Sequence, residues 1–126
     1  MRRTIGLLVL VLVGLAGCVT PSIPIPPPDP AQMNFTVVVQ GQDSTAVFSY
    51  PPKTDYGDAI VYVFNRDQGV GIIAQARPDG SVGPTNPVAG RVNEQIVVSF
   101  QLEDQTVSRC IRLRDGPQDP NNYCGP

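Results

Sequence analysis

Hydrophobic and polar residues alternate with a period of two over much of the chain beyond residue 34, which is the spacing typical of β-strands. Two runs open this pattern, with single faces made of Phe35, Val37 and Val39 and then of Ala46, Phe48 and Tyr50. The segment 41–43 between them begins with glycine and predicts a tight hairpin turn. We therefore expect the domain to begin with two antiparallel strands.

Three further runs occupy the middle of the chain. Residues 59–65 are apolar on both faces, which indicates a central strand. Residues 70–77 form the next run and end at a Pro-Asp-Gly turn. A weak fifth strand within residues 81–88 is confined to a sheet edge, because Pro84 and Pro87 lack the backbone donor that a central strand needs.

The clearest alternation lies in residues 96–102, and a Glu-Asp turn leads from it into a last run over residues 106–114. The side chains of this last run divide between two faces: Val107, Ile111 and Leu113 with Arg109 on one, and Ser108, Cys110, Arg112 and Arg114 on the other. Six or seven strands without an extended helical period predict an all-β fold, a small antiparallel sandwich over residues 34–126.

Turn motifs in this region are similar to those of one class of modules. A valine-alternating strand ends in Asn65, a glycine turn follows, and the turn Asp79-Gly80-Ser81 precedes a further strand. This pattern resembles the bacterial Ig-like and carboxypeptidase-regulatory-like sandwich modules. It departs from them in residues 82–87, where the expected apolar strand reads Val-Gly-Pro-Thr-Asn-Pro. The resemblance implies an Ig-like sandwich that binds or spaces without catalysis.

The first eighteen residues have the organisation of an export signal. Two arginines precede an apolar run over residues 5–15, which is shorter than the roughly 20 residues that a transmembrane helix needs. Leu15-Ala16-Gly17-Cys18 then resembles the lipobox of bacterial lipoproteins. The resemblance implies a signal peptide over residues 1–17 and acylation of the Cys18 thiol, which attaches the protein to a lipid bilayer. The alternative is an ordinary secretory signal followed by a cysteine that carries no lipid.

Val19 follows this cysteine, as in lipoproteins that Gram-negative bacteria send to the outer membrane. We therefore expect a lipid-anchored protein of the cell envelope, in the outer membrane if the host is Gram-negative. Residues 20–30 contain six prolines, which favour an extended polyproline conformation at about 3.1 Å per residue. This predicts a linker over residues 18–33 whose proline run holds the domain roughly 30–35 Å from the membrane.

The composition narrows the function further. The chain has nine Lys or Arg, eleven Asp or Glu and no His. Without Arg2 and Arg3 of the signal peptide, the chain has seven basic and eleven acidic residues, which gives a net charge of −4. We therefore expect no nucleic acid partner. Because His is the commonest general base and metal ligand, its absence argues against an enzyme, and we expect no cofactor. The acidic residues at 55–58 and 103–104 are interpreted as turn residues, with calcium binding at 55–58 as the alternative.

With Cys18 assigned to lipid, Cys110 and Cys124 remain as an even pair in an oxidising compartment, and we predict a disulfide between them. The disulfide would close a loop of fifteen residues (124 − 110 + 1), for which the chain-entropy estimate is about 3 kcal/mol. A metal pair or a redox couple is the alternative.

Arg109, Arg112 and Arg114 form the main basic concentration. They favour either contact with an anionic partner or protection of an edge strand from pairing with neighbours. The patterns as a whole favour a non-catalytic envelope lipoprotein whose sandwich is an interaction or assembly module with a protein partner in the envelope. The alternative is a binder of carbohydrate or polyanion that uses the loops at one end of the sandwich.

Overall fold

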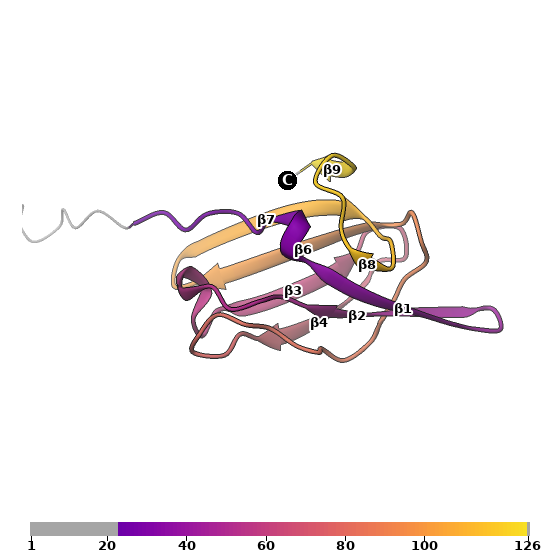
Figure 1. Ribbon diagram of the computed structural model, residues 1–126, viewed down its shortest axis with the longest axis horizontal. Coiled ribbons are helices and arrows are strands. Elements are labelled where there is room, and N and C mark those ends of the chain that lie inside the picture. The colour runs from indigo at the N-terminus through magenta and orange to yellow at the C-terminus, as the bar shows by residue number, and fades with distance from the viewer. Residues whose placement is uncertain (1–22, 126) are drawn as a thin grey trace, which may run out of the picture.

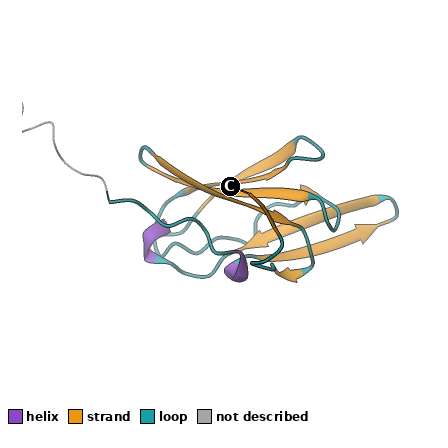
Figure 2. Ribbon diagram, turned by 90° about the horizontal axis from the view of Figure 1, so that it is seen from above, coloured by secondary structure: helices purple, strands orange, loops and turns teal. Residues whose placement is uncertain are grey.

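The computed structural model describes residues 23–125, which form two antiparallel sheets packed face to face, as Figure 1 and Figure 2 show. One sheet has the strand order β5-β2-β1-β8 and the other the order β4-β3-β6-β7-β9. The strands are β1 (Asn34–Gln40), β2 (Asp43–Ser49), β3 (Ile60–Asn65), β4 (Val70–Gln75), β5 (Val88–Ala89), β6 (Gln95–Leu102), β7 (Gln105–Arg112), β8 (Gly116–Pro117) and β9 (Tyr123–Gly125). The predicted all-β antiparallel sandwich is confirmed.

The core lies between the sheets and consists of the inward faces that the alternation predicted. Its fully buried members from the strands include Phe35, Ala46, Phe48, Val61, Val63, Ile96, Val98, Phe100 and Ile111. The run at residues 59–65 forms β3, which lies between β4 and β6 as a central strand should. Its second apolar face, however, is not covered, because Ile60 and Phe64 are 41% and 43% exposed.

Short elements account for the difference between the expected six or seven strands and the nine observed. The C-terminal tail contributes β8 and β9, of two and three residues, which pair with β1 and β7. The weak strand expected within residues 81–88 is reduced to a single bridge between Val82 and Tyr50, and then to β5, which pairs with two residues of β2. The prolines between these two contacts prevent a continuous strand.

The segment 23–33 packs against the sandwich. Met33 is fully buried, and Pro28 and the first residue of the short 3-10 helix η1 (Pro30–Gln32) are also buried. The Tyr56 hydroxyl donates to the Pro26 carbonyl (2.6 Å), and the Asp29 amide donates to the Tyr50 hydroxyl (3.1 Å). Residues 23–33, which were predicted to belong to a linker that separates the domain from the membrane, therefore pack on the domain instead.

Both ends of this segment are held. At its start, the Gln105 side-chain amide donates to the Ile23 carbonyl (2.8 Å) and accepts from the Ile25 amide (2.9 Å). At its end, the backbone amide of Gln118 donates to the Met33 carbonyl (3.0 Å). The Gln118 side chain is 1% exposed and bonds to three backbone groups at 114 and 116, so the C-terminal tail holds this end in place. We call residues 23–33 the N-terminal strap.

Candidate interaction surface

The outward face of β3 and β4 carries a group of large apolar side chains. Ile60, Tyr62 and Phe64 alternate with the buried residues of β3, so they point away from the core. Ile73 lies beside Tyr62 on β4 and is 70% exposed, the highest value among large apolar residues in the strands. We call these four residues the outer β3–β4 surface.

Gly71 shapes this surface. It pairs with Phe64 across the two strands, and a Cβ placed on it would lie 3.0 Å from Cδ2 of the Phe64 ring and 2.8 Å from the Val63 carbonyl oxygen. The missing side chain therefore lets the phenylalanine ring lean toward the edge of the sheet. A shallow cavity of about 250 Å³ opens here, lined by Tyr62, Phe64, Gly71 and Ile73 among others.

The backbone of β4 is open along its free edge. The Ala76 amide donates to the Ala59 carbonyl (2.8 Å) next to β3, which fixes the alternation of hydrogen bonds along this antiparallel pair. The backbone N–H and C=O groups of residues 70, 72 and 74 consequently point toward β3. The amides and carbonyls of Gly71, Ile73 and Gln75 point outward, and among residues 23–125 they have no backbone partner.

The other long edge strands are better protected over the described part of the chain. The edge of β1 pairs with β8 at its first two residues, and the Val37 amide is bonded to the Asp115 carboxylate (2.8 Å). The edge of β7 pairs with β9 at Cys110 and Ile111. Val70–Gln75 contains no charged residue, although natural edge strands usually carry charges that block pairing with another strand. Strand β1 lacks charged residues as well, but β8 and Asp115 cover part of its edge.

Asn65 holds the turn that precedes β4. Its side chain is fully buried, and its carbonyl oxygen accepts from the amides of Asp67 (2.9 Å) and Gln68 (3.1 Å). Its Nδ2 donates to the Ala89 carbonyl (2.9 Å) in the other sheet. The β3–β4 hairpin is therefore tied to the opposite layer and presents its outer surface on a fixed backbone.

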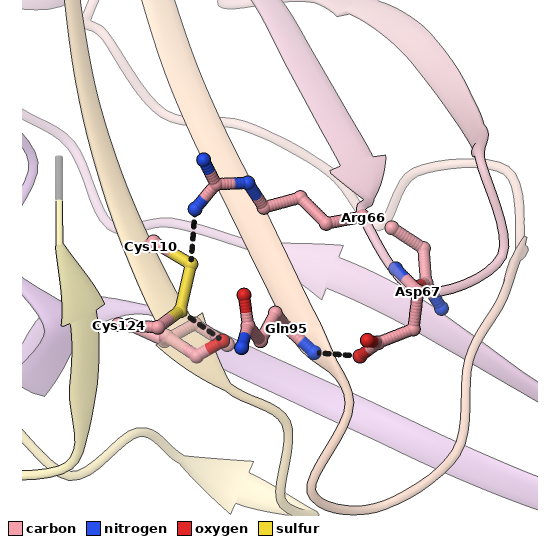
Figure 3. The surroundings of a disulfide bond; sticks show 7 residues. Arg66, Asp67, Gln95, Cys110 and Cys124 are labelled. Atoms are coloured by element: carbon pink, nitrogen blue, oxygen red, sulfur yellow. Dashed lines mark hydrogen bonds between the residues drawn. A yellow bond between two sulfur atoms is a disulfide. The ribbon is translucent and has the colours of Figure 1, made fainter.

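Cys110 and Cys124 are joined by a disulfide, with 4.9 Å between their Cα atoms. Figure 3 shows Arg66 of the β3–β4 turn reaching over β6 toward the bridge, where its Nη1 lies 3.6 Å from the Cys110 sulfur. In the same turn Asp67 accepts the Gln95 amide (2.7 Å). The predicted disulfide is thus present, and the tail that it holds forms β9 beside β7.

The structure does not bring the three candidate arginines together. Arg109 lies on the inward face of β7, opposite Val98, and its buried Nε has no partner among the described residues. Arg112 is exposed on the other face, and the Arg114 Nε donates to the Pro117 carbonyl (2.6 Å). Successive residues of a strand alternate between faces, so these three do not form one anion-binding patch.

Cys18, the predicted lipidation site, lies outside the described residues. Within residues 23–125, no helix has the length and hydrophobicity that crossing a membrane requires. The same part of the chain contains no cluster of three or more Cys, Asp or Glu side chains placed to bind a metal ion.

The titratable groups with raised pKa values belong to the core. Burial raises the pKa of Tyr56 strongly and that of Tyr50 less. The Tyr56 ring is stacked on Phe100 with 4.2 Å between the ring centres, and Tyr50 packs edge-on against both rings. In the exposed turn that follows β4, hydrogen bonds from Ser81 lower the pKa of Asp79. The groups with shifted pKa values therefore lie in the core or in that turn, and none lies on the outer β3–β4 surface.

A second candidate site lies where the tip of the β1–β2 hairpin approaches the loops of the other sheet. A polar cavity of about 540 Å³ is lined there by Gln40, Gln42, Asp43, Gln68 and Arg91 among others. Ser44 also lines it, and its buried hydroxyl has no hydrogen-bond partner within residues 23–125. The Arg91 guanidinium donates to the Gln42 carbonyl and closes one side of the cavity.

Neither candidate surface was assigned from the sequence. The signal for the first was the long run without charge between Asp67 and Arg77, but only the strand order shows that this run is a sheet edge. Comparison of the chain with protein-family models, with curated proteins and with solved structures finds no match.

Proposed function

We propose that this protein is a non-catalytic lipoprotein of the cell envelope whose sandwich binds a protein through the outer β3–β4 surface. The observation that carries this proposal is the combination of three exposed apolar side chains, Ile60, Phe64 and Ile73, with the open, uncharged edge of β4. Exposed apolar side chains grouped on one rigid element are typical of protein contact sites.

The strand order supports the Ig-like module that the sequence resembles. The order β5-β2-β1 facing β4-β3-β6-β7 corresponds to the E-B-A and C′-C-F-G sheets of such sandwiches. The proposal that the module is non-catalytic is supported by Tyr56, whose strongly raised pKa belongs to the packed aromatic core and to none of the cavities described. Tyr50, whose pKa is raised less, packs in the same core and also lines a cavity of about 260 Å³ beside Lys53.

The lipid anchor is tested by fractionation of cells that produce the full chain. Cys18→Ser is expected to keep an uncleaved leader and to carry no lipid, because the thiol that accepts the lipid is lost. Cys110→Ser with Cys124→Ser serves as the control, since it removes two cysteines without touching the leader. Membrane association of the Cys18 variant with normal processing would contradict the anchor.

The protein contact is tested by placing a photo-crosslinking residue at Phe64 in the full chain. Val39 is the matched control, because it is exposed by 65% on the other sheet. A discrete adduct from position 64, absent from position 39, is expected. Equal labelling from both positions contradicts a specific surface.

The polar cavity beside Ser44 favours a second candidate function, the binding of an uncharged polyhydroxyl ligand such as a carbohydrate. Its amide side chains and its unpartnered hydroxyl supply donors and acceptors without a dominant charge. A glycan array tests this candidate, and Gln42→Ala should abolish any specific signal while Ile73→Ala, on the outer β3–β4 surface, leaves it unchanged.

A further inference from the structure

We propose that β4 pairs with β4 of a second copy of this chain, in antiparallel orientation, and joins two five-stranded sheets into one sheet of ten strands. This pairing deepens the proposed function and rests on it, since it names the partner that the outer β3–β4 surface takes. The open backbone, the side chains beside it and the charges at its ends all fit the same register.

The backbone allows a two-fold arrangement. The outward amides and carbonyls belong to Gly71, Ile73 and Gln75, so only these residues can form hydrogen-bonded pairs with another strand. When Gly71 of one copy lies opposite Ile73 of the other, the reverse pair forms by symmetry. These two pairs provide about four hydrogen bonds between the copies.

The side chains are self-complementary in this register. Ile73 is the most exposed large apolar residue of the strands, and Gly71 leaves the outer surface low beside the Phe64 ring. Residues opposite each other on one face have Cβ positions about 5 Å apart, so each Ile73 would lie over the partner copy's glycine and contact its phenylalanine. A symmetric interface needs a projection and a hollow on the same strand, and β4 has both.

The charges also agree. No charged side chain lies within Val70–Gln75, so no like charges face each other along the pairing. In this register the numbers of two paired residues add to 144 (71 + 73). Asp67 and Arg77 also add to 144, so the end of β4 near Asp67 in one copy lies beside the end near Arg77 in the other copy. Both residues are exposed and already bonded within their own copy, Asp67 to the Gln95 amide and Arg77 to Ser81 and Gly83. Their opposite charges therefore add attraction at both ends of the pairing without a new hydrogen bond.

The interface is small. Six residues of a strand extend about 20 Å, and pairing along that length buries far less than the roughly 1,200 Å² of a stable interface. We therefore expect a dissociation constant of about 0.1–1 mM in solution. Confinement of both copies to one membrane would raise their effective concentration and favour the dimer.

Sedimentation equilibrium of residues 18–126 with Cys18→Ser, up to about 2 mM, tests the pairing. Ile73→Lys is expected to weaken dimerisation at least tenfold, because it removes the contact over Gly71 and places two like charges close together. Val39→Lys, on the other sheet, is the matched control and should dimerise like the parent. Unchanged melting temperatures show that both variants fold.

A spin label at Gln75→Cys reports the register. In the proposed pairing the two labelled residues are offset by six positions, which places their backbones about 20 Å apart along the strands. A parent protein that is monomeric throughout the concentration range, an Ile73→Lys variant that dimerises normally, or labels in direct contact would each overturn the pairing. If the parent is monomeric and position 64 crosslinks to another protein, the pairing is wrong and the proposed function stands. If the protein dimerises but the lipid anchor is contradicted, the pairing stands and the proposed function is wrong in that part.

Discussion

Replacement of Tyr56 by phenylalanine tests whether the N-terminal strap is part of the folded domain. Tyr56 is fully buried, and its ring is stacked on Phe100. Phenylalanine keeps this packing and removes only the hydroxyl that donates to the Pro26 carbonyl. The substitution therefore removes one contact between the sandwich and the strap and leaves the core volume unchanged.

The expected cost at pH 7 is about 1 kcal/mol in the free energy of unfolding, the usual net value of a neutral hydrogen bond. For a domain of this size it lowers the melting temperature by roughly 4–8 °C. Urea unfolding measures the total, and hydrogen exchange should show faster exchange in the strap, including the Asp29 amide that is bonded to Tyr50.

The difference in stability between the parent and Tyr56→Phe should also depend on pH. Burial raises the pKa of Tyr56 in the folded protein, whereas an unfolded tyrosine ionises near pH 10. Above that pH the folded state binds more protons than the unfolded state, so stability falls as pH rises, by up to about 1.4 kcal/mol per pH unit for this residue. Phenylalanine lacks this loss. The variant should consequently be less stable than the parent at pH 7 and equal to it by about pH 11.

Tyr62→Phe is the control, because it removes a hydroxyl that bonds to Gln101 and not to any residue of the strap. It should leave hydrogen exchange in residues 23–33 unchanged. If Tyr56→Phe has no effect on stability or on strap exchange, the strap is not held by this contact. If the stability difference between parent and Tyr56→Phe is the same at pH 7 and pH 11, the pH reasoning fails.

Three other substitutions probe the remaining supports of the fold. Removal of the disulfide by Cys110→Ala and Cys124→Ala should lower the free energy of unfolding by about 3 kcal/mol in urea titrations, and the parent should show the same loss in reductant. Gln118→Ala removes three partly buried hydrogen bonds to backbone groups at 114 and 116, so thermal unfolding should show a loss of about 2–3 kcal/mol. Met33→Ala should cost about 2–5 kcal/mol by the same assay, because this side chain is fully buried; a loss below 1 kcal/mol would show that the strap adds little to the core.

The sandwich was predictable because each strand carries its own signal. Alternation in residues 34–50 and 96–102 depends on neighbours two positions apart, and burial follows it at Phe35, Phe48 and Phe100. The strap carried no such signal. Proline restricts its backbone, but its contacts come from tyrosines 21 and 30 positions further along the chain. Contacts of that kind depend on how the sheets pack, which local patterns do not contain.

The interaction surface shows the same limit in another form. Apolar residues on both faces of residues 59–65 predicted a central strand, and β3 is central in its sheet. A central strand is normally covered on both apolar faces, yet Ile60 and Phe64 are exposed because no layer packs on the outer side. The apolar residues of the surface were thus visible in the sequence. Their exposure became clear only from the order of the strands and from the absence, within the described part of the chain, of a third layer over β3 and β4.

The strap and the proposed pairing together restrict how the protein lies on a membrane. If Cys18 carries lipid, five residue steps connect it to Ile23, and they span at most about 18 Å, less than the roughly 30–35 Å expected from the proline run.

Gln105 holds Ile23 at one end of the strands, the end where β7 begins. Antiparallel pairing places these ends on opposite sides of the dimer. With upright strands one of the two anchors would be separated from the membrane by the length of a strand, about 27 Å for the eight residues of β6, and could not reach it. Both anchors reach one membrane when the strands lie along its surface, and the two-fold axis of the dimer is then perpendicular to the membrane.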